Sequence, residues 1–142
     1  MTATGHKSRR RARRVALDIL YEADLLGRAP TVVAGEWEAA GKSVPEYAAE
    51  LVRGIQDGLP AIDDRLGASS EEWTVQRMAA VDRAILRVAC YELNEGTVPP
   101  AVAINEAVEA ANELSTGDSG RFINGVLGRI ARAIGVPDGG ER

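Results

Sequence analysis

The segment AVDRAILRVACYELNE, residues 80–95, decides the fold, because its apolar side chains surround a helix on almost every side. A helix that is apolar nearly all round is normally buried at the centre of its domain. The residues that follow, GTVPP at 96–100, are expected to form a loop, since glycine and proline interrupt regular structure. We therefore predict a central helix over about 80–95, with the other elements packed around it.

The rest of the chain has the spacing of amphipathic helices, with apolar residues recurring every three or four positions. Gly58 and Pro60 interrupt one apolar seam, which predicts a kink or a restart near residue 59, and Gly67 is expected to end that seam. We find no convincing strand or internal repeat. The pattern predicts an all-α fold, a single domain of about six or seven helices. Besides the central one, these are expected over about 8–26, 31–40, 44–66, 69–78, 104–114 and 119–134.

Two helix starts are predicted from capping boxes, in which a Ser N-cap precedes a Glu by three residues. Ser43 and Glu46 have this spacing, with Ser43 as the N-cap, and the run Ser69–Glu72 repeats the pattern before Trp73, an expected apolar anchor. The first helix is expected to bury one apolar stripe that ends at Leu26.

The composition is that of a soluble intracellular protein. Of the 142 residues, 45% are apolar and 27% are charged, which suits one globular domain. A single cysteine allows no internal disulfide and indicates the cytoplasm. Acidic residues break the apolar run that a signal peptide would need, and no segment is apolar enough to span a membrane.

The residues of common catalytic and metal sites are nearly absent. His6 is the only histidine and lies near the N-terminus, and Cys90 falls in the apolar helix, where it is expected to be a small core residue. The glycines near the C-terminus follow no strand, so they match no phosphate-binding loop. We therefore expect no enzymatic activity, no metal and no cofactor.

A cluster of basic residues at the N-terminus is the strongest functional signal. Residues 1–14 carry a charge of +6 and no acid, which leaves −10 for the remainder of a chain whose net charge is −4. Such asymmetry indicates a localised contact with a polyanion rather than non-specific binding to nucleic acid over the whole surface. Arginine forms planar, forked hydrogen bonds to phosphate and stacks on bases, which favours nucleic acid over a merely solubilising tail. The cluster consists of Lys7, Arg9, Arg10, Arg11, Arg13 and Arg14.

A second candidate lies at the predicted start of the last helix, where Asp118 or Ser119 is available as the N-cap. Free backbone N–H groups at a helix start attract anions, and Arg121 beside Phe122 combines a phosphate ligand with a stacking surface. Taken alone, Phe122 is better interpreted as a core residue. A third feature, a polar edge on the central helix that includes Asp82, is either a solvated face or a protein interface.

Three blocks of sequence follow one another along the chain: VDRAILR with YEL at 81–87 and 91–93, AINEA at 103–107, and DS with RFINGVL at 118–119 and 121–127. In order and spacing they resemble the bacterial NusB family of transcription antitermination factors. The arginine-rich first helix with Leu20-Tyr21 also fits, and the resemblance covers roughly residues 8–134.

The resemblance implies two small helical bundles without catalytic activity. Members of this family bind the single-stranded boxA element of ribosomal RNA leader transcripts together with the ribosomal protein NusE. They reach RNA polymerase through other Nus factors and suppress termination. Residues 1–7 are then expected to be a flexible basic arm, 8–136 the RNA-binding domain and 137–142 a disordered tail. The resemblance leaves open whether the free protein forms a homodimer.

Carried over by motif, the resemblance implies specific contacts. Tyr21 and Asp82 would face NusE, and Phe122 would lie close to RNA rather than in the core. Asp18 stands where the family more often has glutamine, and Asn112 replaces a frequent basic residue, which puts RNA affinity in doubt. The implied RNA-binding residues are Arg9, Arg10, Arg11, Arg13, Asp118, Arg121 and Phe122, and the basic cluster adds Arg14.

Two alternatives remain from the sequence. One is the RNA-binding domain of an rRNA cytosine methyltransferase, which contains a similar helical domain. The other is an interaction module that binds only proteins, with the arginines as a solvated tail.

Overall fold

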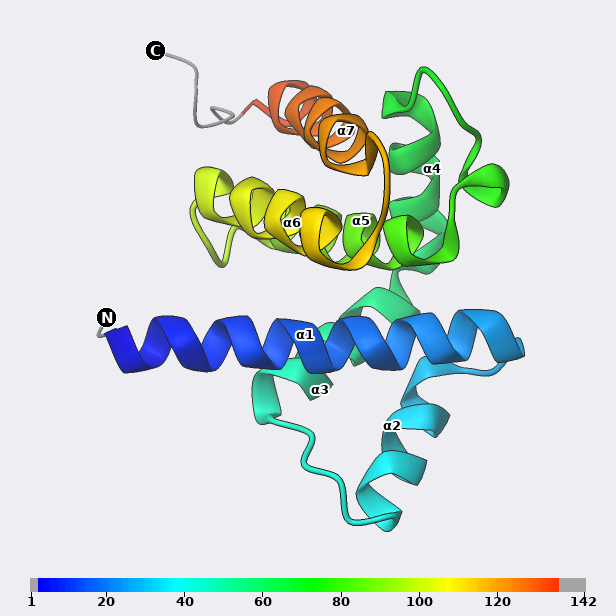
Figure 1. The fold of residues 1–142 in the computed structure, drawn as a ribbon, viewed down its shortest axis with the longest axis vertical. Helices are drawn as coiled ribbons and strands as arrows, with labels where there is room; N and C mark the ends of the chain where they lie inside the picture. Colours follow the sequence, from blue (N-terminus) through cyan, green and yellow to red (C-terminus); the bar gives the residue numbers. More distant parts are fainter. Residues whose placement is uncertain (1–2, 136–142) are drawn as a thin grey trace. The chain divides into compact units, whose positions relative to one another are not determined.

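The computed structural model describes residues 3–135, with side chains from Lys7 onward, and this part of the chain contains helices but no strand (Figure 1). The prediction of an all-α fold is confirmed. The predicted tail at 137–142 lies outside the described residues. In chain order the elements are α1 (Ala3–Leu26), α2 (Pro30–Ala39), α3 (Glu46–Asp57), α4 (Leu59–Ser69), the 3-10 helix η1 (Val75–Arg77), α5 (Ala80–Glu95), α6 (Pro100–Leu114) and α7 (Ser119–Ala133).

The chain divides into two compact units, one ending at Gly58 and one beginning at Leu59. The break between α3 and α4 falls where the sequence predicts a restart, because Pro60 fits the first turn of a new helix but not the interior of an old one. Two units agree with the two small bundles that the resemblance implies. In place of the single core expected from the chain length, each unit has buried apolar residues of its own.

The first unit consists of α1, with α2 and α3 both packed against it. Ile19 of α1 and Leu51 and Ile55 of α3 are completely buried, and each contributes about 1.5–3 kcal/mol through the apolar surface it removes from water. Val33 is the buried residue of α2. These contacts hold the arginine-rich helix α1 on a rigid support.

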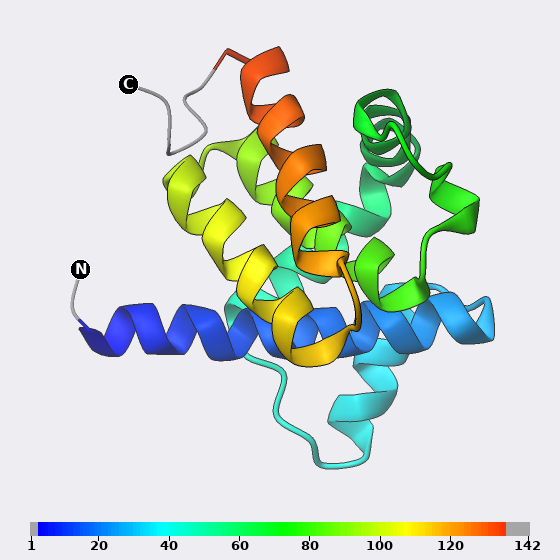
Figure 2. The ribbon, with the colours of Figure 1, turned by 45° about the horizontal axis from the view of Figure 1, so that its top comes forward.

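The second unit is built around α5, which contacts α4, α6 and α7. The prediction of a central buried helix at 80–95 is confirmed, with Leu86 and Cys90 fully buried. Helices α6 and α7 lie side by side (Figure 2). Ile123, Leu127 and Ile130 bury one face of α7, whereas Arg121 in its first turn is exposed.

The structure corrects several predicted boundaries. Helix α1 begins at Ala3 rather than near Ser8, so residues 3–7 belong to the helix instead of a separate arm. The capping box at Ser43 does not form: α3 begins at Glu46 after Pro45, and no side chain caps it. The residue before a proline is kept out of the helical region, so Ser43 lies too far upstream to act as the cap.

The segment 69–78 is not the predicted helix. The Ser70 hydroxyl donates to the Trp73 carbonyl at 2.5 Å and accepts from the Trp73 amide at 3.2 Å, a local pairing that competes with helix formation. Only η1 is helical here, and the expected anchor Trp73 is exposed. Arg83 of α5 holds the loop by donating to the carbonyls of Val75 and Met78 at 2.9 and 3.0 Å.

Gly67 does not end α4, which continues to Ser69. The carbonyl of Ser69 accepts a hydrogen bond from Arg129 Nε of α7 at 2.7 Å. This bond satisfies one of the carbonyls that a helix end leaves open, so the helix can extend two residues beyond the glycine.

Candidate nucleic-acid interface

The arginines of α1 do not share one environment, because a helix turns by about 100° per residue and spreads consecutive side chains around its axis. Arg10 and Arg11 are exposed, Arg9 and Arg14 are half-buried, and Arg13 is only 8% exposed. Arg13 therefore offers little surface to a ligand. The sequence locates the cluster, but only packing separates the accessible arginines from the buried one.

Arg9 is held by an aromatic residue of the neighbouring helix. Its guanidinium carbon lies 4.1 Å from the centroid of the Tyr47 ring of α3, a cation–π contact. Sequence reasoning missed Tyr47, and no spacing rule connects it to Arg9, since the two residues lie on different helices. The contact orients Arg9 while leaving part of its side chain accessible.

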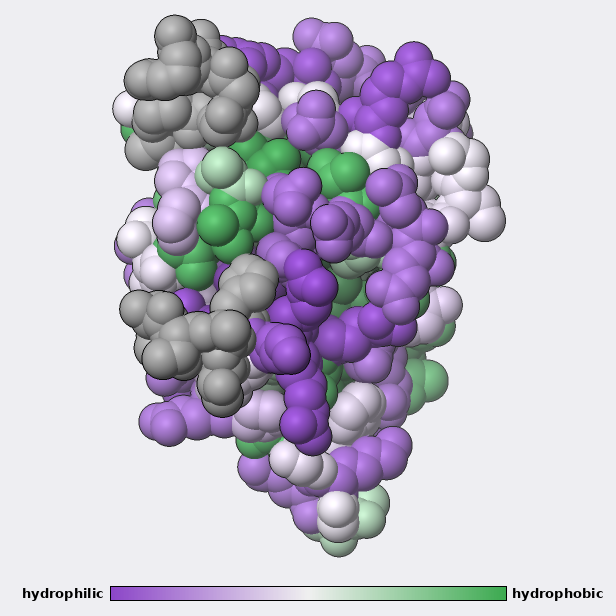
Figure 3. Space-filling view, turned by 60° about the vertical axis from the view of Figure 1, so that its left-hand side comes forward, coloured by the Kyte–Doolittle hydropathy of each residue, from purple (hydrophilic) through white to green (hydrophobic). Residues whose placement is uncertain are grey.

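The outer side of α1 remains basic. Lys7, Arg10 and Arg11 are exposed. Hydrophilic side chains prevail in the space-filling view that brings the N-terminal end of α1 forward (Figure 3). No acidic residue occupies the first turn of α1, where it would favour the helix dipole. The basic residues begin at Lys7, one turn into the helix, so their exposed side chains form a basic surface along the turns that follow.

Arg14 has an acidic neighbour, because its Nε lies 3.8 Å from Oδ1 of Asp18 one turn later. Burial raises the pKa of Asp18, and the charge of Arg14 opposes that rise. At neutral pH the pair partly neutralises Arg14. This geometry gives a physical basis to the expectation that Asp18 weakens contact with RNA.

The start of α7 presents a second basic group. Of the two N-cap candidates, Asp118 occupies the position, but its side chain makes no capping bond. Asp118 Oδ2 instead lies 3.1 Å from Arg121 Nη2, and both side chains are 81% exposed. Such an exposed pair contributes little to stability, so Arg121 is available to an anion. Phe122 is half-buried, so it lies outside the fully buried core and keeps part of its surface accessible.

The two residues assigned to a protein interface differ in exposure. Tyr21 on α1 is exposed, whereas Asp82 in the first turn of α5 is only 7% exposed and accepts a hydrogen bond from the Ser119 hydroxyl at 3.0 Å. The polar edge that contains Asp82 is therefore not a simple solvated face. Asp82 is oriented toward the start of α7, a contact between residues 37 positions apart.

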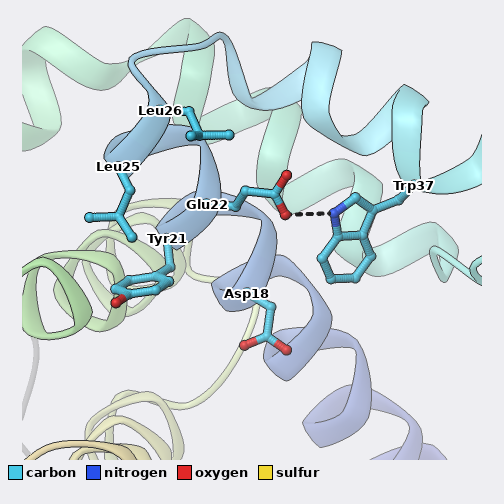
Figure 4. A pocket seen from close by; sticks show the side chains of 6 residues that line it. All are labelled: Asp18, Tyr21, Glu22, Leu25, Leu26 and Trp37. Atoms are coloured by element: carbon cyan, nitrogen blue, oxygen red, sulfur yellow. Dashed lines mark hydrogen bonds between the residues drawn. The ribbon is translucent and has the colours of Figure 1, made fainter.

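Tyr21 borders a hollow of about 460 Å³ between α1 and α2 (Figure 4). Leu25 and Leu26 are 60% and 57% exposed here, so the expectation that the buried stripe of α1 reaches Leu26 is wrong. Trp37 of α2 donates from Nε1 to Glu22 Oε1 at 3.1 Å across the hollow. The lining consists of Asp18, Tyr21, Glu22, Leu25, Leu26 and Trp37.

The lining of this hollow combines exposed apolar side chains with two carboxylates. Sequence reasoning singled out only Tyr21 as an interface residue. The adjacent pair Leu25-Leu26 at the end of a helix was an available signal, because one of two consecutive helical residues generally points away from the core.

The described residues contain little that resembles a reactive centre. Cys90 is fully buried, and this burial raises the pKa of its thiol to about 11. Among residues that the structure describes, no group of three His, Cys, Asp or Glu side chains is placed to hold a metal ion. The side chain of His6 is not among those described. Between residues 3 and 135, no helix is long and apolar enough to cross a membrane.

Comparison with known proteins gives consistent relatives. A family model described as the NusB family matches residues 10–132. The transcription antitermination protein NusB of Salinispora tropica is 50% identical over 129 residues, which cover 87% of this chain and 95% of the relative. The protein of the same name from Saccharopolyspora erythraea is 51% identical over 128 residues, which cover 87% of this chain and 86% of the relative.

Solved structures agree with these relatives. T. maritima NusB superimposes with a TM-score of 0.78 at 35% identity, covering 87% of this chain and 90% of that one. A chain from the crystal structure of antitermination factors NusB and NusE in complex with dsRNA superimposes with a TM-score of 0.79 at 27% identity, covering 89% and 98%.

Proposed function

The chain belongs to the NusB family, and from that premise we propose that it is a non-catalytic antitermination factor that binds boxA leader RNA together with NusE. In this role it acts in the cytoplasm, and other Nus factors connect it to RNA polymerase. The observation that carries the proposal is the exposed Arg121 beside the half-buried Phe122 at the start of α7. This pair offers a phosphate ligand next to a stacking surface.

We assign the RNA contacts on α1 by exposure. Arg10 and Arg11 contact phosphates directly, and Arg9 does so from the orientation that Tyr47 imposes. Arg14 contributes less because Asp18 competes for it. Arg13, which is buried, supports the helix rather than the ligand.

On α7, Arg121 and Phe122 contact RNA, and Asp118 restrains Arg121 through their ion pair. An RNA phosphate competes with the Asp118 carboxylate for the same guanidinium. Asp118 therefore sets how strongly Arg121 binds a phosphate.

The hollow beside Tyr21 is the proposed docking surface for NusE. Its exposed leucines favour an apolar side chain of the partner, and the carboxylates of Asp18 and Glu22 favour flanking positive charge. The Glu22–Trp37 hydrogen bond holds two of the lining residues in place before binding. Asp82, being buried, is assigned no direct contact with NusE.

Fluorescence anisotropy tests the proposal, with a labelled boxA-type RNA and a scrambled RNA of equal length, each with and without purified NusE. We expect selective binding to the boxA-type RNA that becomes tighter when NusE is present. Equal binding of both RNAs, unaffected by NusE, would reduce the arginines to non-specific electrostatics and overturn the proposal.

A further inference from the structure

Three helix ends in the second unit are connected by a chain of side-chain hydrogen bonds. The Ser119 hydroxyl, at the first residue of α7, donates to Asp82 Oδ2 at 3.0 Å. The Ser115 hydroxyl lies 2.8 Å from that of Ser119. Ser115 is the C-cap residue of α6, and Asp82 lies in the first turn of α5. We call Asp82, Ser119 and Ser115 the polar node.

The chemistry of the carboxylate sets the direction of these bonds. An ionised carboxylate only accepts hydrogen bonds, so the single hydroxyl proton of Ser119 is used on Asp82. Ser119 then accepts from Ser115, which is the donor of that pair. The node therefore has one arrangement rather than several, and each hydroxyl has one assigned role.

Asp82 is energetically unfavourable at this buried position. The residue is only 7% exposed, and within the described part of the chain its Oδ1 atom has no hydrogen-bond partner. Burying a carboxylate with an unsatisfied oxygen is unfavourable, although the start of α5 partly compensates through its dipole. When a buried residue lowers the stability of the fold, its presence at that position indicates a functional role.

The node adjoins the part of α7 that carries the proposed RNA ligands. The amide of Phe122 donates to the Asp118 carbonyl at 2.9 Å, so residues 118–122 form one hydrogen-bonded turn. Ser119 lies inside this turn and is tied to α5 and α6. Rotation of the turn about the axis of α7 would break the Ser119 bonds and redirect Arg121 and Phe122 together.

A close approach between α6 and α7 limits the same turn sterically. A Cβ atom on Gly120 would lie 2.5 Å from Oδ1 of Asn112 of α6. Glycine at this position lets the two helices approach, but this contact involves a flexible side chain and does not fix a rotation. The directional hydrogen bonds of the neighbouring Ser119 fix the rotation of the turn, which the steric contact at Gly120 leaves open.

We propose that Asp82 and Ser119 are positioning residues that fix the rotation of the α7 start, so that Arg121 and Phe122 face the RNA. This inference rests on the proposed function, since it takes those two side chains as RNA ligands. It assigns Asp82 an internal role in place of the partner contact that the family resemblance implies.

The test compares RNA affinities of four variants of the full chain for the labelled boxA-type RNA. Ser119→Ala and Asp82→Ala should each weaken binding by about three- to tenfold, the range of coupled residues. Asp82→Asn keeps an acceptor for Ser119 and should restore most of the affinity. Ser70→Ala is the matched control: like Ser119→Ala it removes a hydroxyl that donates one hydrogen bond and accepts another in the second unit, but outside the node, and it should bind like the unmodified protein.

A double-mutant cycle with Arg121→Ala separates positioning from general destabilisation. If the node acts through Arg121 and its turn, Ser119→Ala should have a clearly smaller effect once Arg121 is removed. Equal effects in both backgrounds would overturn the proposal. Hydrogen exchange at the Phe122 amide gives a readout that needs no RNA, and it should be faster in Ser119→Ala than in Ser70→Ala.

The outcomes distinguish this inference from the proposed function. If Arg121→Ala binds RNA normally, the assignment of Arg121 as a ligand fails, while the exchange result still reports on the node. If Arg121→Ala binds weakly but Ser119→Ala and Asp82→Ala bind normally, the proposed function survives and the positioning role is wrong.

Discussion

At the residue scale, the protein balances its positive charges with individual acids. Arg14 lies beside Asp18, and Arg121 lies beside Asp118. In each pair the carboxylate competes with an RNA phosphate for the guanidinium group. Exposed ion pairs of this kind are weak and are broken easily by a stronger ligand. The acids therefore adjust affinity without preventing binding.

Replacing Asp18 with Asn should strengthen RNA binding about two- to threefold in the absence of NusE, the range of an exposed ion pair. The change removes the charge that competes for Arg14. In the unmodified protein, lowering the pH toward the raised pKa of Asp18 should release Arg14 in the same way. Anisotropy titrations at fixed salt measure the effect.

Asp57→Asn provides the control, since Asp57 is an exposed acid of the same unit and makes the same change in net charge. If both variants gain affinity equally, the effect is one of overall charge, and the specific competition between Asp18 and Arg14 is ruled out.

Burial makes the thiol of Cys90 unreactive. Its pKa of about 11 keeps the thiol protonated at neutral pH, and the side chain has no exposed surface. We expect no modification by iodoacetamide at pH 8 in the folded protein and full modification in denaturant. Mass spectrometry checks this, and rapid labelling of the folded protein would contradict the buried position.

At the element scale, α1 serves both as a structural helix and as a binding element. Its inner face builds the core of the first unit, and its outer face carries the accessible arginines. Two arginines three positions apart, Arg10 and Arg13, therefore have different roles. Residues three positions apart lie on the same side of a helix, so spacing alone would not separate these two side chains, and it is the packing around Arg13 that buries it.

Arg10→Ala should reduce the salt dependence of RNA binding by about 0.7 in the log–log slope, the value for one lost phosphate contact on a single strand. Arg13→Ala should leave that slope nearly unchanged and lower the free energy of unfolding by about 1–3 kcal/mol instead, because a buried side chain is lost. Titrations at several salt concentrations and urea unfolding measure the two quantities. The reverse pattern would refute the division of roles along α1.

At the scale of the whole molecule, the two compact units carry different groups of functional residues. The first unit holds the basic side of α1 and the hollow beside Tyr21, and the second holds the start of α7 with the polar node. Each unit has a core of its own. Changes in one unit should therefore leave the folding of the other largely intact.

Binding of NusE and RNA should accordingly be separable by mutation. Tyr21→Ala is expected to weaken NusE binding at least about tenfold, as for an aromatic anchor of an interface, with little effect on RNA alone. Arg121→Ala should weaken RNA binding and leave NusE binding unchanged. Calorimetry with each partner alone measures both. Loss of both activities in either variant would contradict the assignment.

Local patterns in the sequence were enough to locate most of the helices and the basic residues. Apolar spacing over 80–95 and 8–26 is a local property, and a local pattern suffices to place a helix. It also supported the family resemblance through residues that lie close together along the chain. It failed at Ser43 and at Ser69–Glu72, where a proline and a local hydroxyl bond overrode the capping pattern.

Only the tertiary structure decided which of these residues are accessible and what they contact. Tyr47 meets Arg9 across two helices, Ser119 meets Asp82 from 37 residues away, and Leu25 and Leu26 remain exposed beside Trp37. The physical reason is that burial and hydrogen bonding depend on neighbours brought together by packing. A side chain's own position in a helix sets its direction, but the elements packed around it decide whether it meets solvent, an acid or an aromatic ring.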